Sequence, residues 1–201
     1  MEGYLLPILT TIVGIIGTLL TIRYKYKLDL RKREGEGECP IGACVHEDQI
    51  VIEKLKEQLK EIKADRIAIY SFHNGGVYYS GKSIQKLSMS YEEISNGIAS
   101  LMMVKQNIPV SACLTTLNPL LSNGEFHCVD MKNYPEGLGK HHMKEEGIKS
   151  TYNWPIIDIN NNIIGILRVD FVKKKTQLKV DEIEELVKLS TQLPGYLKSH
   201  K

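Results

Sequence analysis

The sequence predicts an α+β fold: an antiparallel sheet flanked by helices, preceded by a transmembrane helix and a short amphipathic linker helix. Three observations lead to this class. Short segments with strand-like composition lie at 66–72, 84–94 and 125–131. Two apolar runs flank the turn residues Asp158–Asn162, which is typical of a hairpin. Segments with helical spacing lie before, between and after these strands, as in domains whose helices gather at the ends of a sheet.

Composition divides the 201 residues into segments of different character. We assign 1–23 as a membrane anchor and 24–46 as a basic linker that contains Gly and Cys. Residues 47–64 are an amphipathic helix, and 65–201 form a globular domain. The formal net charge is +2 and aromatic residues make up 7% of the chain. Proteins that bind nucleic acid usually carry a basic face, so we expect no nucleic-acid partner.

The first segment has the length and hydropathy of a membrane span. Gly3–Ile22 contains no charged residue, and a helix of this length covers about 30 Å, the thickness of a hydrocarbon core. No small-x-small cleavage site follows it, which argues against a signal peptide. Six cations come directly after it: Arg23, Lys25, Lys27, Arg31, Lys32 and Arg33. Because cations stay on the inner side, we expect membrane lipid as a partner, the N-terminus outside and the C-terminal domain in the cytoplasm.

Cys39, Cys44 and His46 lie in the turn-rich linker and raise the question of a metal site. Their spacing is not a standard zinc pattern, and a fourth ligand would have to come from elsewhere. A disulfide between two chains is another possibility, and an unpaired thiol in a loop is the reading that we favour. We therefore predict no metal site, and the role of the two cysteines stays open.

The segment 47–64 has apolar residues at heptad spacing, with Lys and Glu at the outer positions. Ile52, Leu55, Leu59 and Ile62 are separated by steps of three, four and three residues. This pattern favours a short parallel coiled coil and hence a homodimer. The alternative is an amphipathic helix that packs on its own domain.

The remaining elements of the domain are predicted from local signals. Glycine turns mark 73–83, and 96–106 fits a short helix or an apolar loop. The centre of 108–124 is helical, and a polar helix follows at 134–147 with Gly147 as its C-terminal cap. We expect Asp181 to cap the start of the last helix.

The end of the domain resembles a known family, the GAF domains, which are relatives of PAS sensors. The residues that carry the resemblance are "GIKSTYNWPIID" at 147–158, "NNNIIGILRVDFV" at 160–172 and the amphipathic helix after them. Gly165 fits a place where only hydrogen is tolerated between the sheet and a packed helix. The resemblance covers Asp65 to about Lys198. It implies a domain that binds a small molecule or mediates dimerisation.

Two specialised forms of the family are not expected. The Asn-Lys-x-Asp signature of GAF domains that bind cyclic nucleotides is missing. GAF domains that carry a bilin have a cysteine beside a histidine, whereas "FHC" at 126–128 has the reverse order. The resemblance therefore leaves the ligand and any cofactor unknown.

Five residues are candidates for ligand binding: His73, Asn74, Tyr91, Trp154 and Asp170. His73 and Asn74 precede a glycine pair that would let the backbone approach a ligand, although Asn-Gly is also common in hairpin turns. Trp154 is the only tryptophan in the sequence. A large aromatic residue of this kind more often anchors a core than stacks on a ligand. His127 and Asp130 could line the opposite side of the expected pocket together with Asp170. Strand alternation, however, turns the side chain of His127 outward.

Gly76–Ser83 matches the Gly-x4-Gly-Lys-Ser pattern of phosphate-binding loops. Such a loop must leave a strand and open a helix, and the period-two pattern of 84–94 predicts a strand instead. No other catalytic motif is present, so we expect no enzyme. The favoured function is a membrane-anchored, cytoplasmic sensory or interaction domain. The alternatives are a nucleotide-binding enzyme that uses Gly76–Ser83, and a ligand-free membrane scaffold for protein partners.

Overall fold

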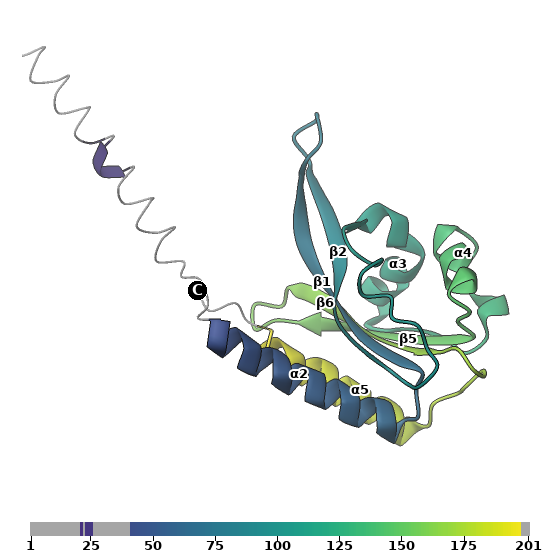
Figure 1. Ribbon diagram of the computed structural model, residues 1–201. Helices are drawn as coiled ribbons and strands as arrows, with labels where there is room; N and C mark the ends of the chain where they lie inside the picture. Colours follow the sequence, from purple (N-terminus) through teal and green to yellow (C-terminus); the bar gives the residue numbers. More distant parts are fainter. Residues whose placement is uncertain (1–20, 22, 26–40, 198–201) are drawn as a thin grey trace, which may run out of the picture. The chain divides into compact units, whose positions relative to one another are not determined.

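The computed structural model describes residue 21 and residues 23–25 and 41–197 (Figure 1). Within these ranges no helix is both long and apolar enough to cross a membrane. The predicted anchor and most of the predicted linker lie outside the described residues. Val45–Lys198 form one compact unit, which holds the whole sheet and its own cores.

The domain is built on one six-stranded antiparallel sheet with the strand order β3-β2-β1-β6-β5-β4. The strands predicted from alternation and the predicted hairpin are all present. The first strand extends past its predicted end, because Asn74 still pairs with Gln85 and Val77 with Ser83. The strand bounds are β1 Arg66–Val77, β2 Ser83–Ile94, β3 Ile108–Pro109, β4 Phe126–Cys128, β5 Ser150–Ile157 and β6 Ile163–Phe171.

Helices cover both faces of this sheet (Figure 1). On one face α2 (Ile41–Glu61) and α5 (Val180–Gln192) lie side by side, and on the other lie α3 (Leu114–Asn123) and α4 (Leu138–Glu145). Residues 96–106 form turns without a helix, so of the two predicted forms the apolar loop is the observed one. The described residues from 41 to 197 also contain three short 3-10 helices: η2 Val110–Cys113, η3 Met131–Asn133 and η4 Leu193–Gly195.

The α2/α5 face holds the largest apolar core. Alternate residues of β5 and β6, such as Trp154 and Leu167, meet the apolar sides of both helices there. Leu55 is fully buried and Leu59 nearly so, while Ile52 is 40% exposed. The heptad residues Leu55, Leu59 and Ile62 thus pack inside their own domain, as the alternative to a coiled coil required. The homodimer stays a prediction.

A β-bulge divides β2 into two halves with opposite orientation. Ile69 pairs with Tyr91 and Tyr70 pairs with Met89, so Ser90 is the extra residue. As a result Met89 packs in the core on the α3/α4 face, whereas Tyr91 packs on the α2/α5 face.

Gly165 in β6 is required by a close backbone contact. A Cβ atom there would lie 2.5 Å from the carbonyl oxygen of Tyr70 on the neighbouring strand. The prediction that only hydrogen fits is therefore confirmed, but the obstacle is the backbone of β1 and not a packed helix.

The two predicted helix caps have different outcomes. Gly147 follows α4 with φ of +69°. Its N–H donates to Lys144 O at 3.0 Å, and the N–H of Ile148 donates to Met143 O at 2.9 Å, so this cap is confirmed. The prediction for Asp181 is wrong, because α5 already begins at Val180 and the side chain of Glu182 accepts from the N–H of Lys179 at 2.8 Å.

Candidate ligand-binding site

A cavity of about 230 Å³ lies between the α3/α4 face of the sheet and the helices that cover it. Its walls are mainly apolar, with Leu87 from β2, Leu117 from α3, Met143 from α4 and Ile166 from β6. Strand alternation explains the sheet side, because residues of β6 that do not face α2 and α5 lie on the α3/α4 face, where Ile166 and Arg168 line the cavity.

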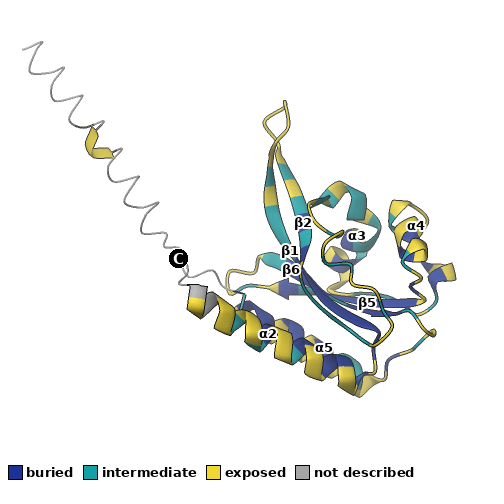
Figure 2. Cartoon of the chain, in the orientation of Figure 1, coloured by how far each residue is buried: buried dark blue, intermediate teal, exposed yellow. Residues whose placement is uncertain are grey.

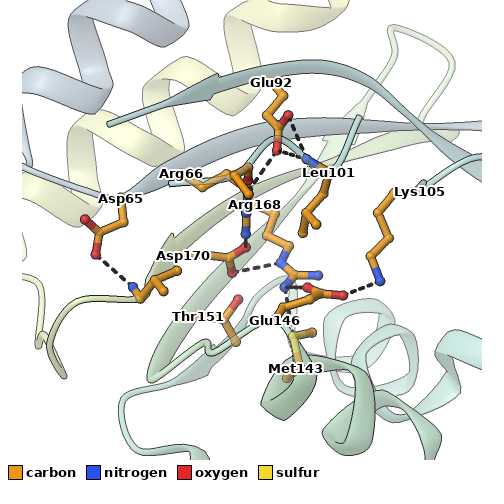
Figure 3. Close-up of polar contacts among 12 residues, drawn as sticks. Asp65, Arg66, Glu92, Leu101, Lys105, Met143, Glu146, Thr151, Arg168 and Asp170 are labelled. Atoms are coloured by element: carbon orange, nitrogen blue, oxygen red, sulfur yellow. Dashed lines mark hydrogen bonds and ion pairs between the residues drawn. The ribbon is translucent and has the colours of Figure 1, made fainter. Parts of the chain in front are cut away.

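A buried carboxylate, that of Glu146, joins three elements at the cavity wall (Figure 3). It pairs with Lys105 from the 96–106 loop, and its Oε2 atom lies 3.6 Å from Nη2 of Arg168 on β6. Arg168 Nε in turn donates to Asp170 Oδ1 at 2.8 Å. The Oε2 atom of Glu146 is buried and accepts no hydrogen bond from any described residue. This oxygen therefore has an ion-pair partner, Arg168, but no hydrogen bond that uses its acceptor capacity.

The ion pairs continue away from the cavity toward the start of β1. Arg66 Nη1 lies 3.7 Å from Asp170 Oδ2, and Arg66 Nε donates to Glu92 Oε1 at 2.9 Å. Glu92 also accepts from the N–H of Leu101 at 3.0 Å, and Arg66 Nη2 donates to Ala99 O at 2.8 Å. These bonds hold the loop that carries Lys105, so the charges order the cavity wall as well as balancing one another.

The ionisation states follow from burial and pairing. Burial alone would lower the pKa of Arg168, but Asp170, Tyr70 and Glu146 raise it overall, so the guanidinium stays charged. Burial raises the pKa of Tyr70, which keeps its phenol neutral. The Tyr70 ring lies 5.9 Å from the Arg168 guanidinium carbon, within cation–π range.

Cys113 is the cysteine that lines the cavity, and its thiol is half-buried. Burial raises the pKa of this thiol, so the reactive thiolate form is disfavoured. The residue after Cys113 is Leu114, so no histidine directly follows this cysteine in the sequence.

His73 and Asn74 lie on the β1–β2 hairpin and not at the cavity. His73 Nε2 is 2.9 Å from Ser88 Oγ, and Asn74 Oδ1 accepts from Gln85 Nε2 at 2.8 Å. Both side chains thus bond across the hairpin, which matches the alternative that this stretch serves the turn.

The other three candidates are also separate from the cavity wall. Tyr91 lies on the α2/α5 face, where its hydroxyl donates to Asp48, and Trp154 is 2% exposed in the same core. Asp170 is buried beneath Arg168 and reaches the cavity only through that side chain. The structure therefore does not bring the five candidates together, and ligand contact by any of them stays a prediction.

His127 points away from Phe126 and Cys128, as alternation predicts, but it is not open to solvent. Its side chain is 19% exposed, and its ring centroid lies 4.8 Å from that of Trp154. Burial lowers the pKa of His127. Asp130 also lies outside the cavity, where it pairs with Lys175.

Gly76–Ser83 is a hairpin turn between β1 and β2. The N–H of Tyr78 donates to Lys82 O and that of Gly81 donates to Tyr78 O, both at 2.8 Å. Ser83 begins β2, so no helix N-terminus is available for a phosphate at this place. The predicted strand after this loop is therefore confirmed, and Gly76–Ser83 does not have the strand-loop-helix context of a phosphate-binding loop.

Among the residues that the structure describes, no cluster of three or more His, Cys, Asp or Glu could hold a metal ion. Cys39 and the side chain of Cys44 lie outside that part of the chain. The absence of a metal site at Cys39 and Cys44 thus stays a prediction, and the role of these two cysteines stays open.

Lys105, Glu146 and Arg168 were not among the predicted site residues. One signal was visible for Arg168, a charged residue within the apolar strand "IIGILRVDF" and two residues before Asp170. A buried charge needs a partner, so this arginine pointed to a paired cluster. Lys105 and Glu146 gave no such signal, because their meeting depends on how the loop and α4 fold.

No family model matches the sequence, and no curated protein matches it. Several solved structures, in contrast, are similar to this chain in fold. A GAF domain region of a putative membrane protein from Geobacter sulfurreducens PCA is 22% identical, with a TM-score of 0.57 over 78% of this chain and 96% of that chain. The PixJ GAF domain of Thermosynechococcus elongatus in its blue-light absorbing form has a TM-score of 0.59 at 14% identity, over 77% and 86%. A phycoerythrobilin-bound GAF domain from a cyanobacterial phytochrome has 0.61 at 18%, over 78% and 87%. The chain therefore has a GAF-like fold.

Proposed function

We propose that this chain is a sensory domain that binds a small molecule in the cavity between its sheet and the α3 and α4 helices. The carrying observation is an apolar cavity with one convergent polar cluster, Lys105, Glu146 and Arg168, supplied by three different elements. Ligand sites usually have this composition. Bilin-bound GAF domains among the similar structures support a small-molecule role for this fold.

The cavity favours a small ligand with an apolar body and a hydrogen-bond donor. Its volume of about 230 Å³ is below the range of about 300–1,000 Å³ found for drug-sized ligands. Leu87, Leu117 and Ile166 would contact the apolar part. An N–H or O–H group of the ligand would compete with Arg168 for Glu146 Oε2, a buried oxygen that accepts no hydrogen bond from the described residues.

The residues present do not fit an attached bilin. A linear tetrapyrrole with two propionates needs a pocket at least as large as that of a drug-sized ligand, about 300 Å³ or more, which exceeds the cavity of about 230 Å³. Its two acids would also need free cations. Arg168 already pairs with Asp170 and Glu146, and Lys105 pairs with Glu146. The thiol of Cys113 has a raised pKa, which disfavours the thiolate.

Signalling would follow from competition for one carboxylate. A ligand that donates to Glu146 changes the balance between this residue and its partners Lys105 and Arg168. Because Glu146 directly follows α4 as its C-cap and Lys105 belongs to the 96–106 loop, two arrangements of these elements would have different ligand affinity, as linkage requires.

The proposal includes attachment to a membrane. The uncharged run Gly3–Ile22 and the six cations after it support a single-pass anchor at 1–23, with the N-terminus outside and the domain in the cytoplasm. A homodimer would place two such domains together, with the exposed side of α2, including Ile52, available for contact.

The test is the thermal unfolding of a 41–201 fragment with a panel of small heterocyclic and aliphatic metabolites. A ligand at about a hundredfold excess over its Kd should stabilise the fold by about 2.7 kcal/mol. Ala112→Phe should fill the cavity and abolish this gain, while Leu121→Phe, at an exposed position of α3, should keep it. If no compound stabilises the fragment but protein partners co-purify, the ligand-free scaffold is the correct reading.

A further inference from the structure

The outer end of the β1–β2 hairpin extends beyond the rest of the sheet (Figure 1), and none of residues 74–83 lines the cavity. Its tip carries three apolar or aromatic residues in succession. Val77 is 68% exposed, Tyr78 48% and Tyr79 fully exposed at 111%, and the tip is exposed throughout (Figure 2). Exposed groups of this kind commonly mark a contact surface.

The hairpin has a one-sided charge. From Arg66 to Ser90 the sequence contains no Asp or Glu. Lys82 at the tip and Lys86 on β2 form no ion pair with any residue in the described part of the chain. The aliphatic part of the Lys86 side chain lies against Gly75. A Cβ atom added at Gly75 would lie 2.5 Å from Cε of Lys86. The hairpin thus presents two free cations beside its aromatic tip.

We propose that this tip, Val77–Lys82, docks on an anionic membrane surface, with the tyrosines in the lipid interface and the lysines at the headgroups. Tyrosine rings favour the membrane interface, because one end is apolar and the other polar. Lysines beside an anionic leaflet add attraction. A bilayer is favoured over a protein partner because the chain also carries the uncharged run Gly3–Ile22, followed by cations. This docking rests on the membrane location proposed above but not on ligand binding.

The β5–β6 hairpin provides an internal control. Its tip also exposes a large apolar residue, Ile159 at 82%. Its only charge is Asp158, whose pKa is lowered by the backbone N–H of Asn162, so the carboxylate is ionised and anionic lipid repels it. Exposure alone is therefore common to both tips, whereas the combination with cations belongs to the β1–β2 tip.

The experiment uses the 41–201 fragment, which lacks the predicted anchor but contains the whole compact unit. It is sedimented with vesicles of phosphatidylcholine alone and of phosphatidylcholine mixed with phosphatidylserine. We expect binding to the mixed vesicles only, weakened by salt. Tyr78→Ser with Tyr79→Ser should lower the partition coefficient about tenfold, and Lys82→Gln about fivefold. Ile159→Ser should leave it within about twofold.

Circular dichroism and the unfolding temperature of each variant show that the fold is intact. The proposal is overturned if the fragment stays in the supernatant with the mixed vesicles, or if Ile159→Ser weakens binding as much as the tyrosine variant. Equal binding to pure phosphatidylcholine would also overturn it. A failure here leaves ligand stabilisation of the cavity unaffected, so the two proposals are tested separately.

Discussion

Under α2 and α5 the sheet presents Trp154 from β5 and Leu167 from β6, whereas under α3 and α4 the same two strands present Asn153 and Arg168. Adjacent residues of one strand thus serve two different interiors. The first is filled by apolar side chains. The second contains a cavity and a line of paired charges. One alternating pattern of side chains thus separates the face of the sheet that stabilises the domain from the face that can receive a ligand.

The two faces should respond differently to substitution. On the apolar face, stability comes from burial and close packing, so removing methyl groups leaves a void. On the charged face, desolvation opposes pairing, so loss of one partner is costly because the remaining charge stays buried.

Asp170→Ala should be the most damaging change, with a loss of about 3–5 kcal/mol in the free energy of unfolding. Asp170 is 1% exposed and neutralises both Arg168 and Arg66. Urea denaturation measures the loss, and Asp158→Ala at the exposed turn is the control. A loss no larger than that of the control would mean that the charged face does not depend on its ion pairs.

Leu55→Ala should cost about 3 kcal/mol on the apolar face, since this side chain is fully buried between α2 and the sheet. Ile52→Ala on the same helix, at a 40% exposed position, should cost less than about 1 kcal/mol. The same denaturation experiment compares them. Equal losses would contradict the packing of α2 on its own domain and would favour the heptad pattern acting between two chains.

Gly165→Ala should destabilise by about 2 kcal/mol, because the new methyl group would meet the Tyr70 carbonyl oxygen. This residue connects the two faces, since it sets the distance between β1 and β6. Gly195→Ala is a matched control, as its Cβ would meet no atom within 4 Å. Thermal unfolding of both variants checks the prediction, and similar midpoints would exclude a tight strand contact at Gly165.

Asp65→Asn should give the smallest loss, about 1 kcal/mol at neutral pH. Burial would raise the pKa of Asp65, but the N–H groups of Lys173 and Val172 lower it overall. Since the folded pKa is depressed, the stabilisation is present above the ordinary value of 3.8 and is lost as the pH falls through the folded pKa. The stabilities of wild type and variant should therefore converge in acid. A constant difference across the pH range would show that the charge of Asp65 is not involved.

Most of the sheet could be predicted from the sequence, because alternation and turn residues are local signals. The hairpin around Asp158–Asn162 and the cap at Gly147 were found in this way. The cap of α5 was missed because the side chain of Glu182 accepts from the backbone N–H of Lys179, which makes Lys179 the N-cap, two residues before Asp181.

The candidate site was far less accessible to sequence reasoning. The cavity depends on the meeting of Lys105 from a loop, Glu146 at the end of α4 and Arg168 in β6. These contacts join distant parts of the chain, so neither spacing nor composition indicates them. The predicted Trp154 instead serves the apolar core, as large aromatic residues often do.

The bulge at Ser90 has a consequence for how this domain tolerates changes in length. Residues of β2 on the tip side of Ser90 can be extended by whole hairpin pairs, while Glu92 on the other side continues to hold the loop at Leu101. Loss of Ser90 itself would turn the side chains of one half of the strand to the opposite face, bringing Met89 onto the α2/α5 face or Tyr91 onto the α3/α4 face. Insertions should therefore accumulate at the far end of the hairpin, and single-residue deletions near Ser90 should be selected against.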